Sequence, residues 1–246
     1  MIKILVVNGW TKEGDKQHEN ANCILQKDIF EHLIKATLPN SKVDICDTYD
    51  EDLLINLDSY DAFMWTGGGG NIYEKNNHNF SQLKLCERIL DKKKPIWGSC
   101  WGMQVIVTAL GGLVKKSQKP EFGYSKDIKI INPILNNSIY NNKRNTFDAP
   151  AHHYDIVDKL PDEFEIITEN EVCIQSIHSS SSNIFCTQYH SELPYDYIAN
   201  LMLFWRDNYG KFFSDLEFDK VLDNLKTKEK EDRGERLKEI DIGYLY

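Results

Sequence analysis

The amino-acid sequence predicts an α/β fold, with a doubly wound, mainly parallel sheet of the flavodoxin-like kind and helices on both of its faces. Two observations support this prediction. Short apolar runs, typical of strands buried on both faces, alternate with segments of helical periodicity through the first 110 residues. A run of glycines and a Gly-flanked cysteine each follow directly on one of these apolar runs. Such residues gather at the carboxyl edge of a parallel sheet, where open α/β sheets bind their ligands.

The first half of the chain carries the clearer pattern. Residues 2–8 form an apolar run that stops at Gly9, as expected of a strand covered on both faces. A helix is expected over 20–38, because apolar residues recur there at helical spacing until Pro39 ends the pattern. The other elements expected in this half are strands at 42–48, 62–65 and 95–97, helices at 80–90 and 103–110, and a linking segment at 52–58.

Beyond Gly112 the pattern is richer in strands. Short apolar runs predict strands at 112–116, 127–131, 163–168, 173–177 and 184–189. Ser and Asn favour turns, so residues 179–183 are expected to form a hairpin turn between the last two strands. A helix is expected to follow at 194–209, and the residues expected on its inward face are Tyr197, Leu201, Phe204 and Trp205.

The composition changes near Asp207. Residues 1–206 are expected to form the main domain, and residues 207–246 a charged C-terminal helical extension. Lys, Glu, Asp and Arg dominate residues 226–239, which is typical of a solvent-exposed helix. A helix that docks on a partner is the alternative interpretation.

Charge and cysteine usage exclude several classes of protein. The formal net charge is −9 and the basic residues are scattered, which argues against nucleic acid as a partner. Six cysteines without a Cys-x-x-Cys pair predict neither a disulfide framework nor a zinc site, and favour a reducing compartment. No run approaches the roughly 18 apolar residues of a membrane span, and the first apolar run is too short for a signal peptide. We therefore expect a soluble, cytoplasmic protein that does not bind membranes.

Cys100 lies in the sequence Gly-Ser-Cys-Trp-Gly at 98–102, between an expected strand and an expected helix. Glycines two residues before and after it allow a tight, strained turn that exposes the sulfur, as in a nucleophile elbow. The positive end of the following helix would then favour negative charge on the sulfur. A buried structural cysteine in a Gly-flanked turn is the alternative.

His190 and Glu192 are the expected partners of Cys100. They are two residues apart, just past the strand expected at 184–189, so an extended backbone places both side chains on one face. Glu192 can then accept a hydrogen bond from one ring nitrogen while the other nitrogen faces Cys100, as nucleophilic catalysis requires. A surface ion pair is the alternative explanation of a His-x-Glu pair.

Four consecutive glycines, residues 67–70, follow the strand expected at 62–65. A loop without side chains can direct backbone N–H groups toward a developing oxyanion. Gly68 is one expected donor, and Trp101, immediately after Cys100, is the other. A phosphate-binding loop is the alternative, but the run lacks the Gly-Lys-Ser/Thr ending of a P-loop.

Together these residues resemble the class I, or triad-type, glutamine amidotransferase family over roughly residues 3–205. The resemblance rests on four ordered segments: PIWGSCWGMQ at 95–104, GGLV at 111–114 with EFG at 121–123, HYDIV at 153–157 before Leu-Pro at 160–161, and QYHSE at 188–192. It implies a catalytic triad of Cys100, His190 and Glu192 and an oxyanion hole from Gly68 and Trp101. It also implies a glutamine pocket, without cofactor or metal, lined by Gln104 and a loop containing His153, Tyr154 and Asp155.

Two positions depart from the family pattern. Ser191 stands where the family usually has Pro between the catalytic His and Glu, so we expect slightly looser geometry with the chemistry retained. Gly69 takes the Pro position of the family's Gly-Gly-Pro oxyanion loop, which predicts a more flexible loop.

The activity that the resemblance implies is hydrolysis of a γ-glutamyl amide through a thioester on Cys100, with release of glutamate and of ammonia or an amine. The expected partner is therefore a small γ-glutamyl substrate. One alternative is a glutaminase subunit that feeds ammonia to a separate synthetase or regulates it. Another is a non-catalytic binding module. A metal-dependent hydrolase is a further alternative, with candidate ligands His152, His153, Asp155, His178, His190 and Glu192, but their spacing matches no metal signature.

Overall fold

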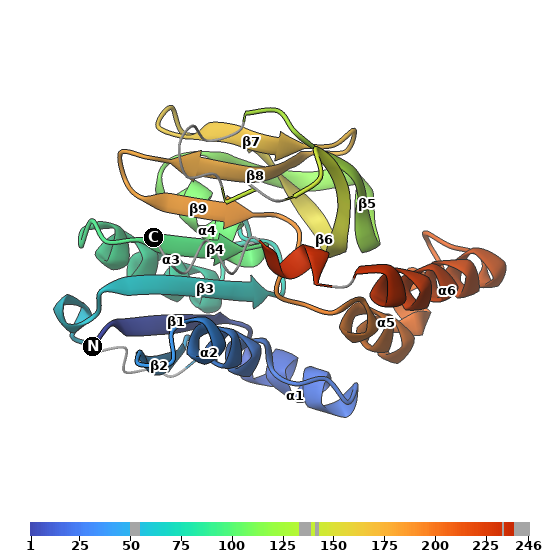
Figure 1. Cartoon of the computed structure of the whole chain (residues 1–246), viewed down its shortest axis with the longest axis horizontal. Coiled ribbons are helices and arrows are strands. Elements are labelled where there is room, and N and C mark those ends of the chain that lie inside the picture. The colour runs from blue at the N-terminus through green and yellow to red at the C-terminus, as the bar shows by residue number, and fades with distance from the viewer. Residues whose placement is uncertain (50–54, 133–138, 141–142, 233, 239–246) are drawn as a thin grey trace.

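The chain folds around a mixed sheet that has nine strands within the described residues (Figure 1). The computed structural model describes residues 1–49, 55–132, 139–140, 143–232 and 234–238. The strand order is β2-β1-β3-β4-β9-β8-β7-β5-β6. The parallel half comprises β2 (Lys42–Asp47), β1 (Lys3–Gly9), β3 (Ala62–Gly68), β4 (Ile96–Ser99) and β9 (Ile184–Thr187). The antiparallel half adds β8 (Ile174–Ser179), β7 (Glu165–Glu169), β5 (Leu113–Ile130) and β6 (Thr146–Lys159).

Helices cover both faces of the parallel half, which confirms the predicted fold class. Side chains of β1 alternate between the two faces, because successive residues of a strand point in opposite directions. Ile4 and Val6 pack in one core cluster, and Leu5 and Val7 pack in another. The first cluster includes residues of α2 (Gln26–Thr37), and the second includes residues of α3 (Asn77–Leu90) and α4 (Trp101–Ala109).

The helix expected over 20–38 is present in a shorter form, and a further helix that was not predicted precedes it. The two helices are α1 (Lys12–Asn20) and α2, which begins six residues later than expected. Thr11 caps α1 by accepting a hydrogen bond from the Gly14 N–H at 3.0 Å, and Asn22 separates the helices with a positive φ of 55°. Helix α1 escaped prediction because its sequence, KEGDKQHEN, contains no apolar periodicity.

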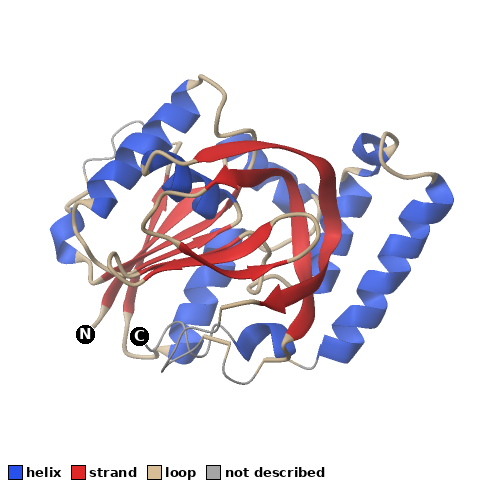
Figure 2. Ribbon diagram, turned by 90° about the horizontal axis from the view of Figure 1, so that it is seen from above, coloured by secondary structure: helices blue, strands red, loops and turns tan. Residues whose placement is uncertain are grey.

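The strands expected at 112–116 and 127–131 are the two ends of one long strand, β5. Its partner β6 was not predicted as a strand, and residues 153–155, expected in a loop, lie within it. Irregular pairing between Lys116 and Glu121, and again between Ser125 and Ile128, interrupts the alternation along β5. Figure 2 shows the two strands as a long, curved ribbon at one end of the sheet.

The other predicted elements lie within about three residues of the observed bounds, including the hairpin turn between β8 and β9. The helix expected over 194–209 is α5 (Tyr195–Phe204), followed by a 3₁₀ turn at Arg206–Tyr209. Tyr197 and Leu201 are buried as expected. Phe204 is 44% exposed, so its predicted inward position is wrong. Residues 52–54 of the expected linking segment lie outside the described residues.

Helix α6 (Asp215–Asp232) forms most of the described C-terminal extension and packs against α5 at the carboxyl edge of the parallel strands (Figure 1). One face of α6 is buried through Phe218, Leu222 and Leu225. Residues 226–232 are exposed or half-buried, as expected of a charged helix, while 239–246 lie outside the described residues. In the described part of the chain, no helix combines the length and apolar character needed to cross a bilayer.

The boundary at residues 206 and 207 stays a prediction, which Leu225→Ala tests. Leu225 is completely buried beside residues of α5, so its truncation is expected to destabilise the protein by about 2–5 kcal/mol. Urea unfolding should remain a single transition if α6 folds with the rest of the chain. Leu216→Ala is the matched control, because Leu216 is 81% exposed and its loss should change stability by less than about 0.5 kcal/mol. Two separate transitions, with only one shifted by Leu225→Ala, would establish an independent extension.

Candidate active site

Cys100 lies at the corner between β4 and α4 in a strained backbone conformation, with φ 48° and ψ −95°. A non-glycine residue at positive φ of this kind costs about 1–3 kcal/mol and persists only where the surroundings enforce it. A Cβ atom at Gly98 would approach Ile106 Cδ1 to 2.8 Å, and one at Gly102 would approach the Trp65 carbonyl oxygen to 2.8 Å. The two glycines therefore permit the tight elbow that the sequence predicts.

His190 and Glu192 lie beyond the end of β9, the strand beside β4. His190 Nδ1 is 2.7 Å from Glu192 Oε1, and both residues are 3% exposed, which excludes a surface ion pair. The His190 side chain is also hydrogen-bonded to Cys100. Ser99 Oγ donates to Glu192 Oε1 at 2.8 Å and thereby fixes the carboxylate. The ring of His190 thus links a buried carboxylate to the sulfur at the elbow.

The buried carboxylate determines the charge of His190. Burial opposes the charged imidazolium, but the negative charge of Glu192 and the hydrogen bond to Cys100 outweigh it and raise the pKa of His190 to about 10. His190 is therefore positively charged at neutral pH.

Cys100 opens into a cavity of about 230 Å³. The cavity brings together all the residues predicted for the oxyanion hole and the glutamine pocket, which are Gly68, Trp101, Gln104, His153, Tyr154 and Asp155. His190 and Glu192 are not among its lining residues. The arrangement places the candidate nucleophile at a cavity wall, with the side chain of His190 hydrogen-bonded to it.

The glycine loop is packed directly on Trp101. A Cβ atom at Gly68 would lie 2.5 Å from Trp101 Cγ, so only glycine fits at this position. The Trp101 ring is held in turn by a hydrogen bond from Nε1 to Gln82 Oε1 at 2.8 Å. The backbones of both predicted oxyanion donors are thereby held next to Cys100.

Asp155 lines the cavity and has one acceptor without a hydrogen-bond partner among the described residues. Its Oδ1 accepts a hydrogen bond from the Tyr73 hydroxyl at 3.2 Å, while its Oδ2 is buried without a hydrogen-bond partner among the described residues. Burial raises the pKa of this carboxyl group. An ammonium group of a ligand would satisfy Oδ2 and would favour the ionised carboxylate.

Gln104 and His153 line the cavity and are also hydrogen-bonded within the protein. Gln104 Nε2 is 3.3 Å from both the Asp155 carbonyl oxygen and Gln188 Oε1, and Gln188 Nε2 donates to Cys100 Sγ at 3.3 Å. His153 lies 3.1 Å from Glu121 Oε2 through Nε2 and 3.1 Å from the Asp155 carbonyl oxygen through Nδ1. Both side chains therefore position Asp155.

Sequence reasoning did not assign Ser99, Gln188 or Tyr73 to the site. Ser99 and Gln188 lie within the segments that carry the family resemblance, so their place in those segments was an available signal. Tyr73 lies outside these segments, and its contact with Asp155 joins residues 82 positions apart.

One group of side chains in the described part of the chain has donor atoms close enough for a metal, namely Glu121, His153 and Cys173. Glu121 already accepts hydrogen bonds from Asn170 at 2.7 Å and from Gln175 at 2.6 Å. Burial raises the pKa of the Cys173 thiol, which keeps it protonated and a poor ligand. A hydrogen-bonded network accounts for this group. The ligand set considered for a metal-dependent hydrolase forms no such group among the described residues.

The fold and the site define the class of protein: an α/β protein with a cysteine on a strand-to-helix elbow and a His-x-Glu pair at the end of the adjacent strand. The model of the family described as glutamine amidotransferase class-I matches residues 25–203. This match spans most of the chain, and the chain belongs to that family.

Two kinds of known protein are similar to this chain in sequence. GMP synthase [glutamine-hydrolyzing] from Petrotoga mobilis is 32% identical over 147 residues, which cover 59% of this chain and 27% of that enzyme. The chain thus matches only about a quarter of the length of this GMP synthase. Gamma-glutamyl-L-1-hydroxyisopropylamide hydrolase from Pseudomonas is 26% identical over 201 residues, which cover 78% of this chain and 68% of that enzyme.

Solved structures share the fold. A glutamine amidotransferase from Thermotoga maritima matches with a TM-score of 0.69 and 22% identity, over 97% of this chain and 96% of that one. A glutamine amido transferase from Methylobacillus flagellatus matches with a TM-score of 0.73 and 14% identity, over 100% of this chain and 94% of that one. These likenesses confirm the predicted α/β architecture.

Proposed function

We propose that the protein hydrolyses γ-glutamyl amides, with Cys100 as nucleophile, His190 as proton-transfer group and Glu192 as the carboxylate that orients and charges His190. One observation carries the proposal. His190 is hydrogen-bonded to Cys100 and lies 2.7 Å from the buried Glu192, while Cys100 occupies the elbow at the wall of the cavity. The family membership and the named γ-glutamyl amide hydrolase among the relatives support the same activity.

The reaction follows from this geometry. The Cys100 thiolate attacks the side-chain carbonyl of the γ-glutamyl group, and the backbone N–H groups of Gly68 and Trp101 stabilise the oxyanion. The His190 imidazolium donates its proton to the leaving nitrogen, so the C–N bond breaks and a thioester remains. Neutral His190 then takes a proton from water, which attacks the thioester. Glutamate leaves, and the thiolate and imidazolium are restored.

A second candidate is an amidotransferase subunit that hydrolyses glutamine only when a separate synthetase is bound. The glutamine-hydrolysing GMP synthases among the relatives favour it, because this chain matches about a quarter of the length of one of them. The two candidates share one covalent step at Cys100 and differ in whether the isolated chain turns over.

The test is release of glutamate from L-glutamine and from N-substituted γ-glutamyl amides by the isolated protein. It is paired with labelling by a glutamine analogue that carries a chloroketone electrophile. We expect turnover and selective alkylation of Cys100, located by peptide mass spectrometry, with the other five cysteines unmodified and substrate protecting Cys100. Labelling without turnover would favour the partner-dependent subunit. Neither labelling nor turnover would refute both candidates and favour the non-catalytic binding module.

Asp155→Asn is expected to raise KM for γ-glutamyl substrates by about 10- to 100-fold and to change kcat little. Asp155 lines the cavity, its Oδ2 has no hydrogen-bond partner among the described residues, and a hydrogen bond to a charged group contributes about 1.5–3 kcal/mol. The amide keeps an oxygen for Tyr73 but loses the charge that would bind the substrate's α-ammonium group. Steady-state kinetics beside Asp127→Asn, a change at an exposed side chain of β5, provide the measurement and its control. An unchanged KM would remove Asp155 from substrate binding.

A further inference from the structure

One side of the cavity is a continuous wall of rings. Trp10 precedes α1, Trp205 and Tyr209 follow α5, and His152 lies on β6; all four line the cavity. The ring centroid of Trp205 lies 6.5 Å from that of Trp10 and 5.6 Å from that of His152, whose centroid is 5.9 Å from that of Tyr209. These four residues are the aromatic wall. They come from three separate parts of the chain and meet beside Cys100.

The aromatic wall carries no charge at neutral pH. Burial lowers the pKa of His152 to about 3, so its ring is neutral, and its Nε2 lies 2.5 Å from the Tyr209 hydroxyl. The described residues that line the cavity include no Lys and no Arg, and Asp155 is the one carboxylate among them. Apart from the Cys100 sulfur, the cavity therefore offers one carboxylate and an uncharged ring surface.

Trp10 occupies space that a side chain at residue 69 would need. A Cβ atom at Gly69 would lie 2.8 Å from Trp10 Cζ3. Position 69 is where the chain departs from the Gly-Gly-Pro loop, and the indole explains the departure, because a proline ring and the indole would compete for the same space. The absence of a side chain at Gly69 thus brings an aromatic ring next to the oxyanion loop.

We propose that the aromatic wall binds the amine half of the substrate and selects γ-glutamyl amides whose nitrogen carries a neutral, apolar group. This inference rests on the proposed function. Asp155 is the counter-charge for the α-ammonium of the glutamyl half, which leaves no counter-charge for a second charge on the amine half. A charged amine half would be desolvated against rings without a partner, whereas an alkyl or aryl group gains from burial there. At about 230 Å³, the cavity suits a γ-glutamyl group with a small substituent.

Three substrates test the selection in the wild-type protein: L-glutamine, γ-glutamyl-n-butylamide and γ-glutamyl-(4-aminobutyl)amide. The last two are a matched pair that differs by one terminal ammonium group. We expect kcat/KM for the butylamide to exceed that for each of the others by at least about tenfold. Aromatic rings also attract cations. A preference for the aminobutyl amide, or for glutamine, would therefore overturn the proposal.

Variants at Trp10 and Gly69 test whether the aromatic wall causes the preference between substrates. Trp10→Ala is expected to lower the ratio of butylamide to glutamine kcat/KM by at least about tenfold. Gly69→Ala should impair both substrates, because the added Cβ meets the indole. Combining Gly69→Ala with Trp10→Ala should restore glutamine hydrolysis but not the preference for the butylamide. An unchanged substrate ratio in Trp10→Ala would contradict the proposal.

The same measurements distinguish failure of the substrate selection from failure of the proposed hydrolase function. If the protein cleaved all three substrates without preference, only the selection by the aromatic wall would be wrong. If it cleaved none but the chloroketone labelled Cys100, protection of Cys100 by the same three compounds should give the same ranking. If there were neither cleavage nor labelling, both proposals would be refuted.

Discussion

Replacing Cys100 with alanine is expected to lower kcat/KM for γ-glutamyl amides by at least about 10⁴-fold, because triad residues act as a unit and loss of the nucleophile removes most of the catalysis. The fold should be retained. Alanine keeps the Cβ atom, so the strained conformation at φ 48° is no more difficult for alanine than for cysteine. The change removes one side-chain hydrogen bond from Gln188, at 3.3 Å, and the bond to His190.

Glutamate release, followed beside urea unfolding, measures both consequences of Cys100→Ala. Cys86→Ala is the matched control, because it makes the same chemical change at a completely buried cysteine of α3. We expect this control to retain activity and to lose some stability from the cavity it creates. Residual activity above about 1% in a folded Cys100→Ala protein would exclude Cys100 as the nucleophile.

The fold prediction was accurate for strands that are buried on both faces, and it missed a strand in which only alternate residues are buried. Strands β1, β3 and β4 are buried on both faces, so their apolar runs identified them without ambiguity. Strand β6 was missed although alternate residues along it are buried, because Pro150, two histidines and Asp155 occupy its middle. The last three of these line the cavity. The polar residues that line the cavity thus interrupt the apolar alternation by which β6 could have been recognised as a strand.

The candidate site was predictable where local backbone geometry dictates residue type. Neither Gly98 nor Gly102 has room for a side chain, because Gly98 lies against α4 and Gly102 lies against Trp65 of β3, so the pattern around Cys100 could be recognised from five residues. Contacts between distant residues gave no such signal. Ser99 meets Glu192 across 93 positions, and Trp205 meets Trp10 only because α5 returns to the carboxyl edge of the sheet. These contacts depend on topology, which residue spacing does not encode.

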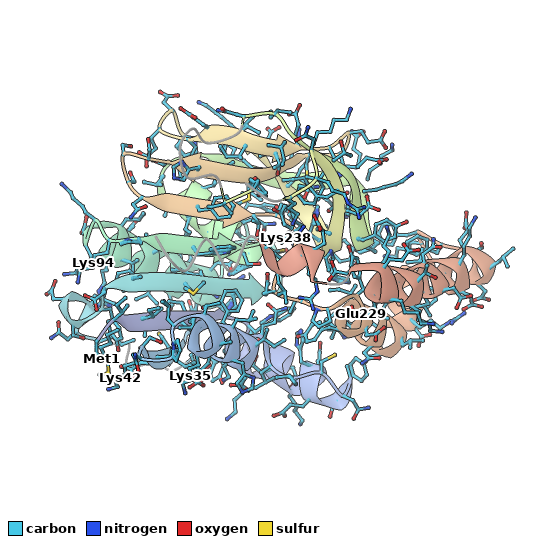
Figure 3. The ribbon with its side chains drawn as sticks, viewed as in Figure 1. Met1, Lys35, Lys42, Lys94, Glu229 and Lys238 are labelled. Carbon is cyan, nitrogen blue, oxygen red and sulfur yellow. The ribbon has the colours of Figure 1, made fainter. Side chains whose placement is uncertain are left out.

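Ser191 illustrates how the structure can offset a departure in sequence. The looser geometry expected without proline is not evident, because His190 and Glu192 lie 2.7 Å apart. The C-terminal part of the chain holds the segment that follows His190. Arg236 Nη1 lies 3.4 Å from the Ser191 carbonyl oxygen, and Glu229, labelled in Figure 3, accepts the Tyr195 N–H at 2.7 Å. Helix α6 and the turn after it therefore brace the segment that carries His190 and Glu192.

Glu192→Gln is expected to lower kcat/KM by about 10³- to 10⁴-fold, as replacing the buried carboxylate of a triad by an amide does elsewhere. Glu192 Oε1 accepts hydrogen bonds from Ser99 and from His190, at 2.8 and 2.7 Å. An amide has one oxygen and no charge. It would leave Ser99 or His190 without an acceptor, or turn its NH₂ group toward the ring and hold the wrong tautomer.

The pH dependence of kcat/KM distinguishes a role of Glu192 in setting the charge of His190 from a purely structural role. Burial opposes charge on His190, but Glu192 and Cys100 raise its pKa to about 10, so the imidazolium that protonates the leaving nitrogen is lost only as the pH approaches that value. Without the carboxylate the pKa of His190 falls, and the alkaline limb of the kcat/KM profile should move to lower pH.

The free energy of unfolding should depend on pH through the same raised pKa of His190. A raised pKa stabilises the wild-type fold fully below the unfolded value of about 6.5 and progressively less as the pH rises toward 10, and the variant's curve should be flatter. Glu165→Gln, at an exposed position of β7, is the control. If Glu192→Gln kept the wild-type alkaline limb, Glu192 would support the fold without setting the charge of His190.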